Sequence, residues 1–153
     1  MNSVNQVGRR QLPHEPPPWV CDPAGETFFL TLCAQNRSGH PLLENDAAVR
    51  LLEAVQFYNE RGKWWTSLAV VMPDHLHLLT SFPEELAPTV RAWKHWTGRH
   101  IGIEWQRDFF DHRLRRDEKF NETAAYILHN PVRAGLVDDW RKWPHVWMTQ
   151  EPD

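Results

Sequence analysis

Cysteine is scarce in this chain of 153 residues, which contains only Cys21 and Cys33. Two cysteines cannot build a disulfide framework, and these two do not form a C-x-x-C pair. Long apolar runs are also absent, because none approaches the roughly 20 residues that a membrane helix requires. The polar, Pro-rich N-terminal segment lacks the apolar core of a signal peptide. These absences predict a soluble cytoplasmic protein that has no membrane partner.

Tyrosine is rare as well, whereas tryptophan and histidine are abundant. The chain has two tyrosines, nine tryptophans and nine histidines. A core of this size does not easily enclose nine indole rings. We therefore expect some of them to be exposed or to line a groove, where they can stack on nucleobases or on a partner.

Charge is unevenly distributed along the chain. The formal net charge is −3, yet the segment from Arg91 to Arg116 carries +4 and the remainder carries −7. A negative total argues against a general polyanion binder, whereas a local basic segment is what phosphate contacts need. An ordinary solvated surface is the alternative that composition leaves open.

The length suits one domain with short extensions. Residues 1–24 are rich in proline and have no helical or strand period, which predicts an extended arm. Residues 25–137 hold the periodic segments and form the predicted domain. Residues 138–153 form a Trp-rich tail, whose indole rings we expect to pack against the sheet in preference to stacking on bases.

Hydrophobic periodicity predicts an α+β fold. The expected elements are a strand over 27–34, a helix from about 45 to 61, strands over 64–72 and 75–82, a helix from about 88 to 98, a strand within 103–114, and a helix from about 117 to 130. This order is that of the ferredoxin-like split βαβ unit, an antiparallel sheet with two helices on one face, followed by a C-terminal helix.

Two histidines alternate on the third predicted strand. His75 and His77 flank Leu76, and residues at i and i+2 of a strand project from the same face. Two imidazoles placed in this way can converge on one divalent ion. For an isolated pair, two polar residues on the wet side of a sheet are the more common outcome.

The last predicted helix carries Tyr126 and Asn130, one turn apart on a flank of its apolar stripe. Their phenol and carboxamide groups can therefore act on the same object, although an exposed tyrosine is more often a surface residue. The second tyrosine, Tyr58, belongs to an amphipathic core stripe and is expected to pack.

The pair His75 and His77, taken together with Tyr126 and Asn130, predicts a function more specifically than either pair alone. Two imidazole nitrogens and one amide oxygen make a mixed site with open positions, which suits Mg²⁺ or Mn²⁺ engaged with a phosphate. A tyrosine oxygen beside such an ion can attack a phosphodiester, provided that the metal or a base activates it.

Three segments resemble the single-tyrosine HUH transposases, in particular the REP-associated tyrosine transposases. Residues 71–79, VMPDHLHLL, resemble the histidine-hydrophobe-histidine motif of that group. Residues 126–137, YILHNPVRAGLV, resemble its tyrosine motif and are the most specific match. Residues 105–112, WQRDFFDH, and the pair Trp93-Lys94 also fit the pattern.

The resemblance implies a metal-dependent endonuclease and strand transferase that acts on single-stranded DNA folded into imperfect-palindrome hairpins. It implies that Tyr126 is the nucleophile, leaving a 5′-phosphotyrosine and a free 3′-OH, and that His75, His77 and Asn130 are the ligands of Mg²⁺ or Mn²⁺. No ATP is needed, because the phosphotyrosine conserves the bond energy for rejoining. A homodimer is compatible with this reading.

Basic residues near these motifs are candidate DNA contacts. Arg91, Lys94 and Arg99 have helical spacing on the second helix, where a solvated face is a near-equal alternative. A second group of arginines directly precedes the tyrosine helix and is predicted to clamp DNA near the site: Arg113, Arg115 and Arg116.

Two other functions compete with this hypothesis. The first is a non-catalytic descendant that binds DNA hairpins as a regulator. The second is a ferredoxin-like protein-interaction module whose two histidines hold a structural Zn²⁺, which predicts no DNA affinity and leaves the pairing of Tyr126 with Asn130 unexplained.

Overall fold

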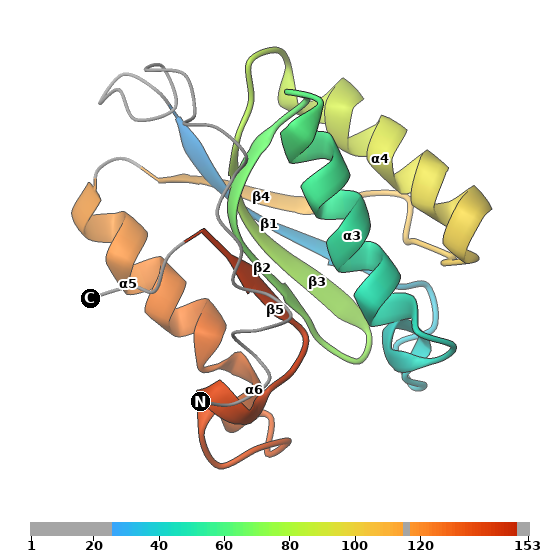
Figure 1. Ribbon diagram of the computed structural model, residues 1–153, viewed down its shortest axis with the longest axis vertical. Coiled ribbons are helices and arrows are strands. Elements are labelled where there is room, and N and C mark those ends of the chain that lie inside the picture. Colours follow the sequence, from blue (N-terminus) through green and yellow to red (C-terminus); the bar gives the residue numbers. More distant parts are fainter. Residues whose placement is uncertain (1–25, 115–116, 150–153) are drawn as a thin grey trace.

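The computed structural model describes residues 26–114 and 117–149, and Figure 1 shows how its elements are arranged. The strands are β1 (Thr27–Cys33), β2 (Trp65–Val71), β3 (His75–Ser81), β4 (Phe110–Leu114) and β5 (Val146–Met148). The helices are α3 (Ala47–Glu60), α4 (Leu86–Ile101), α5 (Asp117–Leu128) and α6 (Asn130–Arg133), with single 3-10 turns η1 (Pro41–Leu43) and η2 (Trp140–Lys142). The arm predicted for residues 1–24 lies outside the described residues.

The five described strands form one antiparallel sheet in the order β4-β1-β3-β2-β5. From β1 to α5, the long helices and the strands follow one another in the predicted order, so the α+β class and the antiparallel sheet are confirmed. The central strand β3 pairs with β1 on one side and with β2 on the other. Its histidine pair therefore lies in the interior of the sheet.

Helices cover both faces of the sheet, with α3 and α4 side by side on one face and α5 on the other (Figure 1). The α3/α4 face of β3 carries Leu76 and Leu78, which pack with Val90 and Trp93 of α4. The α5 face carries Leu79, which packs with Ile127 of α5. Side chains that alternate along β3 thus contribute to two separate hydrophobic cores, one on each face of the sheet.

The helix α4 extends beyond the predicted stop at Gly98. An added Cβ at Gly98 would lie 3.2 Å from the carbonyl oxygen of Ile103, so this glycine provides a close backbone approach inside the helix. The helix ends instead at Gly102, whose φ of 89° is in the left-handed region and whose N–H donates to the carbonyl of Gly98. That conformation favours glycine.

The C-terminal segment completes the sheet. β5 pairs with β2, with Trp147 opposite Ala69, and no sequence pattern had predicted this strand. Trp143 is buried and its Nε1 donates to the carbonyl of Val71 at 3.0 Å. The expectation that tail tryptophans pack against the sheet is confirmed for Trp143 and Trp147.

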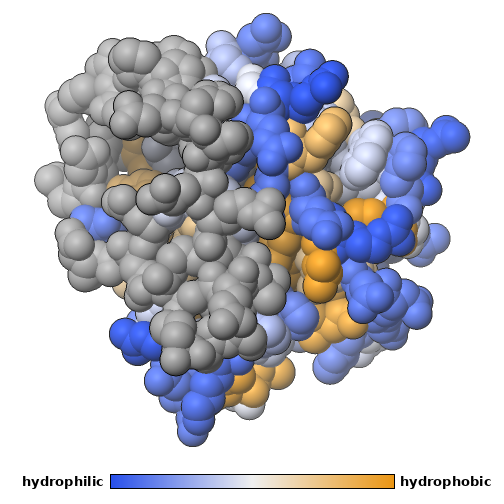
Figure 2. Space-filling model, viewed as in Figure 1, coloured by the Kyte–Doolittle hydropathy of each residue, from blue (hydrophilic) through white to orange (hydrophobic). Residues whose placement is uncertain are grey.

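On the face seen in Figure 2, hydrophobic residues gather over α3 and between α3 and α4, within a mostly hydrophilic surface. Among the eight tryptophans in the described ranges, only Trp96 is classed as exposed, and it stacks on Phe57 of α3. The prediction that some indole rings are exposed therefore holds for one ring. No helix within residues 26–114 and 117–149 has the length and apolar character to cross a membrane.

Candidate active site

The two histidines of β3 face α5, as strand alternation predicts. His75 and His77 lie with their ring centroids 4.6 Å apart and their planes at 74°. Leu76, between them, is fully buried in the core of the opposite face. The pair is thus built by the pleat of a single strand, and no loop has to order to bring it together.

His77 is a buried, neutral imidazole. Its residue surface is 8% exposed, and its Nδ1 lies 3.1 Å from the hydroxyl oxygen of Thr31 on β1. Burial, reinforced by the neighbouring charges of His75 and Arg133, lowers the pKa of His77 to about 3. At neutral pH this ring therefore keeps an unprotonated nitrogen.

His75 is held by a chain of charged groups. Its Nδ1 lies 2.8 Å from Oδ1 of Asp74, and Oδ2 of Asp74 accepts a hydrogen bond from Nε of Arg37 at 2.6 Å. Burial raises the pKa of the Asp74 carboxyl, but the hydrogen bonds from Arg37 and His75 outweigh it and leave that pKa below its usual value. The carboxylate accepts a hydrogen bond from the Nδ1–H group of His75, so the lone pair of the ring lies on Nε2.

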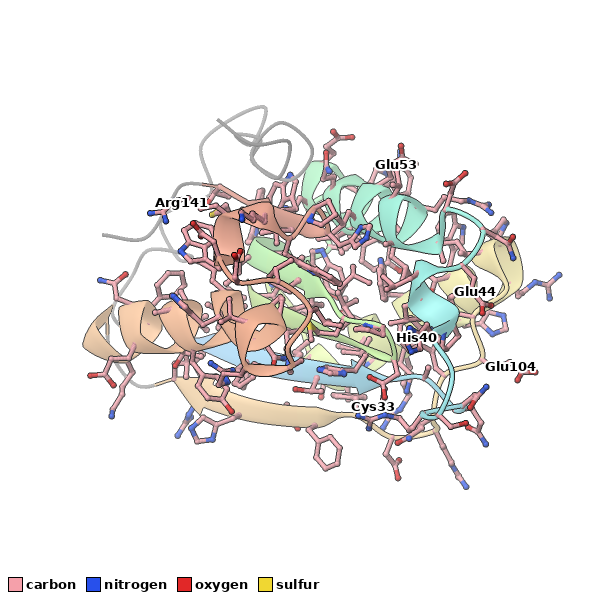
Figure 3. All side chains as sticks on the ribbon, turned by 90° about the horizontal axis from the view of Figure 1, so that it is seen from below. Cys33, His40, Glu44, Glu53, Glu104 and Arg141 are labelled. Carbon is pink, nitrogen blue, oxygen red and sulfur yellow. The ribbon has the colours of Figure 1, made fainter. Side chains whose placement is uncertain are left out.

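Arg37 is itself positioned by the end of β1. Its Nη1 lies 3.1 Å from Sγ of Cys33, the buried cysteine that Figure 3 labels where β1 ends. Neither Asp74 nor Arg37 was predicted as a site residue from the sequence. A carboxylate directly before a candidate metal-ligating histidine was the signal that pointed to this support.

Asn130 reaches the histidines from the other layer. Its Nδ2 lies 3.4 Å from Nε2 of His75, although 55 positions separate the two residues in the chain. Pro131, which has no N–H to donate, follows in the first turn of α6, and the helix α5 ends just before it at Leu128. The tertiary fold thus brings together His75, His77 and Asn130.

These three side chains fit a divalent ion. His75 offers the lone pair of Nε2, and His77 is neutral. Rotating the Asn130 amide by 180° exchanges its nitrogen and oxygen, so that the oxygen can point toward His75 and act as a ligand. The described residues contain no group of three His, Cys, Asp or Glu side chains that could hold a metal. The candidate set is therefore mixed nitrogen and oxygen, which suits Mg²⁺ or Mn²⁺ better than a structural Zn²⁺.

Tyr126 lies on α5, four positions before Asn130, which is the first residue of α6. Its residue surface is 56% exposed. The guanidinium carbon of Arg133 lies 3.8 Å from the centroid of the Tyr126 ring, and Nη2 of Arg133 donates to the backbone carbonyl of Tyr126 at 2.7 Å. Arg133 was missed by sequence reasoning, although its spacing of seven from Tyr126 repeats the helical stripe.

Proteins of known family resemble this chain over most of its length. A Haemophilus influenzae protein assigned as a REP-associated tyrosine transposase is 28% identical over 141 residues, which cover 79% of this chain and 78% of that protein. The REP-associated tyrosine transposase of Escherichia coli K12 is 26% identical over 125 residues, covering 78% and 74%. No family model matches the chain.

A solved structure shares the arrangement as well as the sequence. It is a REP-associated tyrosine transposase bound to a REP hairpin, and it matches with a TM-score of 0.69 at 26% identity over 80% of this chain and 76% of that one. The chain is similar to REP-associated tyrosine transposases in both sequence and fold. The resemblance predicted from the histidine and tyrosine motifs is therefore confirmed.

One predicted DNA contact has a structural role instead. Lys94 is buried, and its ammonium donates to the carbonyls of Gln106, Arg107 and Asp108 at 2.7, 2.9 and 3.2 Å. An ammonium has three N–H donors, so none is left for a phosphate. Helical spacing alone did not reveal that the loop before β4 covers this side chain.

The other predicted cations do not surround the tyrosine. Arg91 and Arg99 are exposed on α4, which packs on the sheet face opposite the histidines. Arg113 pairs with Phe28 of β1, and Phe28 packs with the α3/α4 core, so Arg113 projects from that same face. It forms an ion pair with Glu26 at 2.6 Å. Arg115 and Arg116 lie outside the described residues.

The +4 segment is therefore divided in space, and Arg133 and Arg37 are the arginines that the described structure places at the cluster. Arg37 is committed to Asp74. Arg133 has no carboxylate partner among the described residues. It is consequently the free positive charge beside Tyr126.

Proposed function

We propose that this chain is a REP-associated tyrosine transposase that cleaves and rejoins single-stranded DNA beside hairpins, with Tyr126 as the nucleophile. The observation that carries the proposal is the convergence of His75, His77 and Asn130, with the exposed Tyr126 four positions before Asn130 and in contact with Arg133. Its relative with a bound REP hairpin supports the choice of DNA hairpins as substrate.

The reaction is a transesterification at phosphorus. The phenolic oxygen of Tyr126 loses its proton and forms a bond to the scissile phosphorus, while the bond to the 3′ oxygen breaks and that oxygen gains a proton. The products are a 5′-phosphotyrosine and a free 3′-OH, and the reverse attack by a 3′-OH rejoins a strand. One phosphodiester is exchanged for another, so no nucleotide cofactor is required.

The chain's own residues prepare this step. Arg133 stacks on the Tyr126 ring and restrains its rotation, and its charge attracts the phosphate. Asp74 orients His75, and the buried His77 stays neutral, so both rings present lone pairs to an ion. Mg²⁺ or Mn²⁺, when bound by His75, His77 and Asn130, supplies Lewis-acid polarisation of the phosphate.

The fold is consistent with this assignment. We propose that β1 to β4 with α3 and α4 are a ferredoxin-like unit, because the strand order β4-β1-β3-β2 and the placement of both helices on one face are those expected of it. α5 then acts as an added element that carries Tyr126 across the opposite face.

The proposal is tested by a denaturing-gel assay for a covalent protein–DNA adduct. The probe is an imperfect-palindrome hairpin with an unpaired flank, taken from DNA next to the gene, incubated with Mn²⁺ or with EDTA. We expect an adduct with Mn²⁺ only, and none from Tyr126→Phe. Tyr58→Phe is the matched control: its ring packs edge-on against Trp64 at 5.1 Å, so it should retain the adduct.

Arg133→Lys separates positioning from charge in the same assay. Lysine retains the positive charge but lacks the planar guanidinium that stacks on Tyr126. Adduct formation should slow in single turnover while hairpin affinity is retained. If the wild-type chain binds hairpins in a salt-sensitive manner but forms no adduct, it is a hairpin-binding regulator. If an adduct forms equally with Tyr126→Phe, the assigned nucleophile is wrong.

A further inference from the structure

The most exposed of the large hydrophobic side chains in the described ranges belongs to Phe110, at 69%. It lies at the start of the edge strand β4. Phe57 and Trp96, also exposed, stack on each other with centroids 6.3 Å apart. Within the described ranges the Phe110 ring has no aromatic or cationic neighbour, and most of its surface is open to solvent.

The ring shares a face and a row with the candidate active site. Phe110 is opposite Thr31 of β1, and Thr31 is opposite His77 of β3. Directly opposed residues of an antiparallel sheet project from the same face. Two strand spacings of about 4.8 Å place Phe110 about 10 Å from His77 along that row.

The backbone that presents Phe110 is firmly anchored. Lys94 holds the three carbonyls directly before β4, as described above. Gln106 donates from its backbone N–H to the carbonyl of Cys33 at 2.8 Å, and from its side chain to the carbonyl of Ala34 at 3.3 Å. These hydrogen bonds hold the backbone that leads into β4, so a ligand that contacts the ring needs to order little else.

The surroundings of the ring favour a small planar ligand over a protein partner. The next residues of β4, Asp111, His112 and Arg113, are exposed and polar. A stable protein interface needs a broad apolar area, of which one phenyl ring is a small part. One free ring face is, by contrast, all that one nucleobase needs, and stacking of this kind is indifferent to base identity.

We infer that Phe110 is a stacking site for one unpaired nucleobase of the bound DNA, on the same sheet face as the histidine pair. The inference rests on the proposed function, since it takes a single strand at that pair as given. It assigns an unpaired base, and not the hairpin stem, to β4. Stacking on an aromatic side chain is typically worth about 1–3 kcal/mol per base, which corresponds to a roughly 5- to 150-fold change in affinity.

The test compares two matched substitutions, Phe110→Leu on β4 and Phe57→Leu on α3. Binding is measured at one salt concentration, in EDTA, to a hairpin with an unpaired flank at its foot and to the same hairpin cut blunt. We expect Phe110→Leu to weaken binding of the flanked probe about tenfold and to leave the blunt probe unchanged. Phe57→Leu should change neither, and Phe110→Trp, which retains a ring, should bind the flanked probe as tightly as wild type.

Abasic substitutions along the flank then locate the base. At one position of the flank, the abasic probe should bind wild type and Phe110→Leu with equal affinity. The missing base and the missing ring each remove the same stacking contact, so losing both costs no more than losing one. Equal binding of the flanked probe by wild type and Phe110→Leu would overturn the inference and leave the proposed function standing. An equal loss on both probes, or a change in oligomeric mass with unaltered DNA binding, would also overturn it. If the wild-type chain binds neither probe, the proposed function fails as well.

Discussion

Replacing Lys94 with methionine should destabilise the fold, although the sequence suggested a surface cation at this position. Methionine keeps most of the side-chain length but has no donors, so the carbonyls of Gln106, Arg107 and Asp108 lose their shared partner. Hydrogen bonds to charged groups contribute about 1.5–3 kcal/mol each. Burial also lowers the pKa of the Lys94 ammonium, so desolvation offsets part of that sum.

We therefore expect a net loss of about 3 kcal/mol in the free energy of unfolding for Lys94→Met. For a chain of this size, a loss of that magnitude lowers Tm by about 6–12 °C, which thermal unfolding followed by circular dichroism resolves easily. Arg91→Met is the matched control, because Arg91 is exposed on the same helix. It should change the free energy of unfolding by no more than about 0.5 kcal/mol.

Equal Tm values for the two variants would refute this reasoning, since they would show that the three carbonyls gain nothing from the ammonium. A loss of hairpin affinity in Lys94→Met, without any loss of stability, would restore Lys94 as a phosphate contact. A drop in stability accompanied by weaker binding of the unpaired flank would link the Lys94 anchor to the strand that presents Phe110.

Two further predictions concern the metal cluster and the response to acid. Asp74→Asn should weaken Mn²⁺ binding by about 10- to 100-fold in calorimetry, because His75 loses the carboxylate that orients it. Its hairpin affinity in EDTA should be retained. The control Asp138→Asn, at the exposed pair with Lys142, should change neither the Mn²⁺ affinity nor the hairpin affinity. Burial lowers the pKa of His145, so the unfolded chain takes up a proton near pH 6.5 while the folded chain resists it, and stability is lost as pH falls below that value. Urea denaturation at pH 7 and pH 5 should show a smaller acid loss in His145→Gln, and identical losses would contradict the assignment.

Local patterns were sufficient to predict most of the framework. Alternation along β3 assigned His75 and His77 to one face and Leu76 to the other, and the helical period placed Tyr126 and Asn130 one turn apart. Strand and helix periods depend on neighbouring residues in the chain, so they can be read without knowing the fold. The order of these elements then sufficed for the α+β class, and the quoted motifs sufficed for the resemblance to the family.

The strand β5 shows where such patterns stop. Residues 146–148 are too short a segment for alternation to stand out, and they become a strand because β2 offers a free edge to pair with. No sequence pattern in β2 or in residues 146–148 identifies the two segments as partners. The same holds for Asn130 and His75, whose meeting requires both the sheet and the path of α5 across it.

By itself, then, the sequence identified the candidate residues for the chemistry and most of the helices and strands that carry them. Tertiary structure alone decided which charges remain available. The carbonyls of the loop that covers Lys94 occupy its ammonium, and the register of β4 places Arg113 on the face opposite the histidines. Arg133 of α6 contacts the Tyr126 ring. The physical reason is that burial and charge pairing depend on what distant parts of the chain place beside a residue, whereas periodicity depends only on its neighbours.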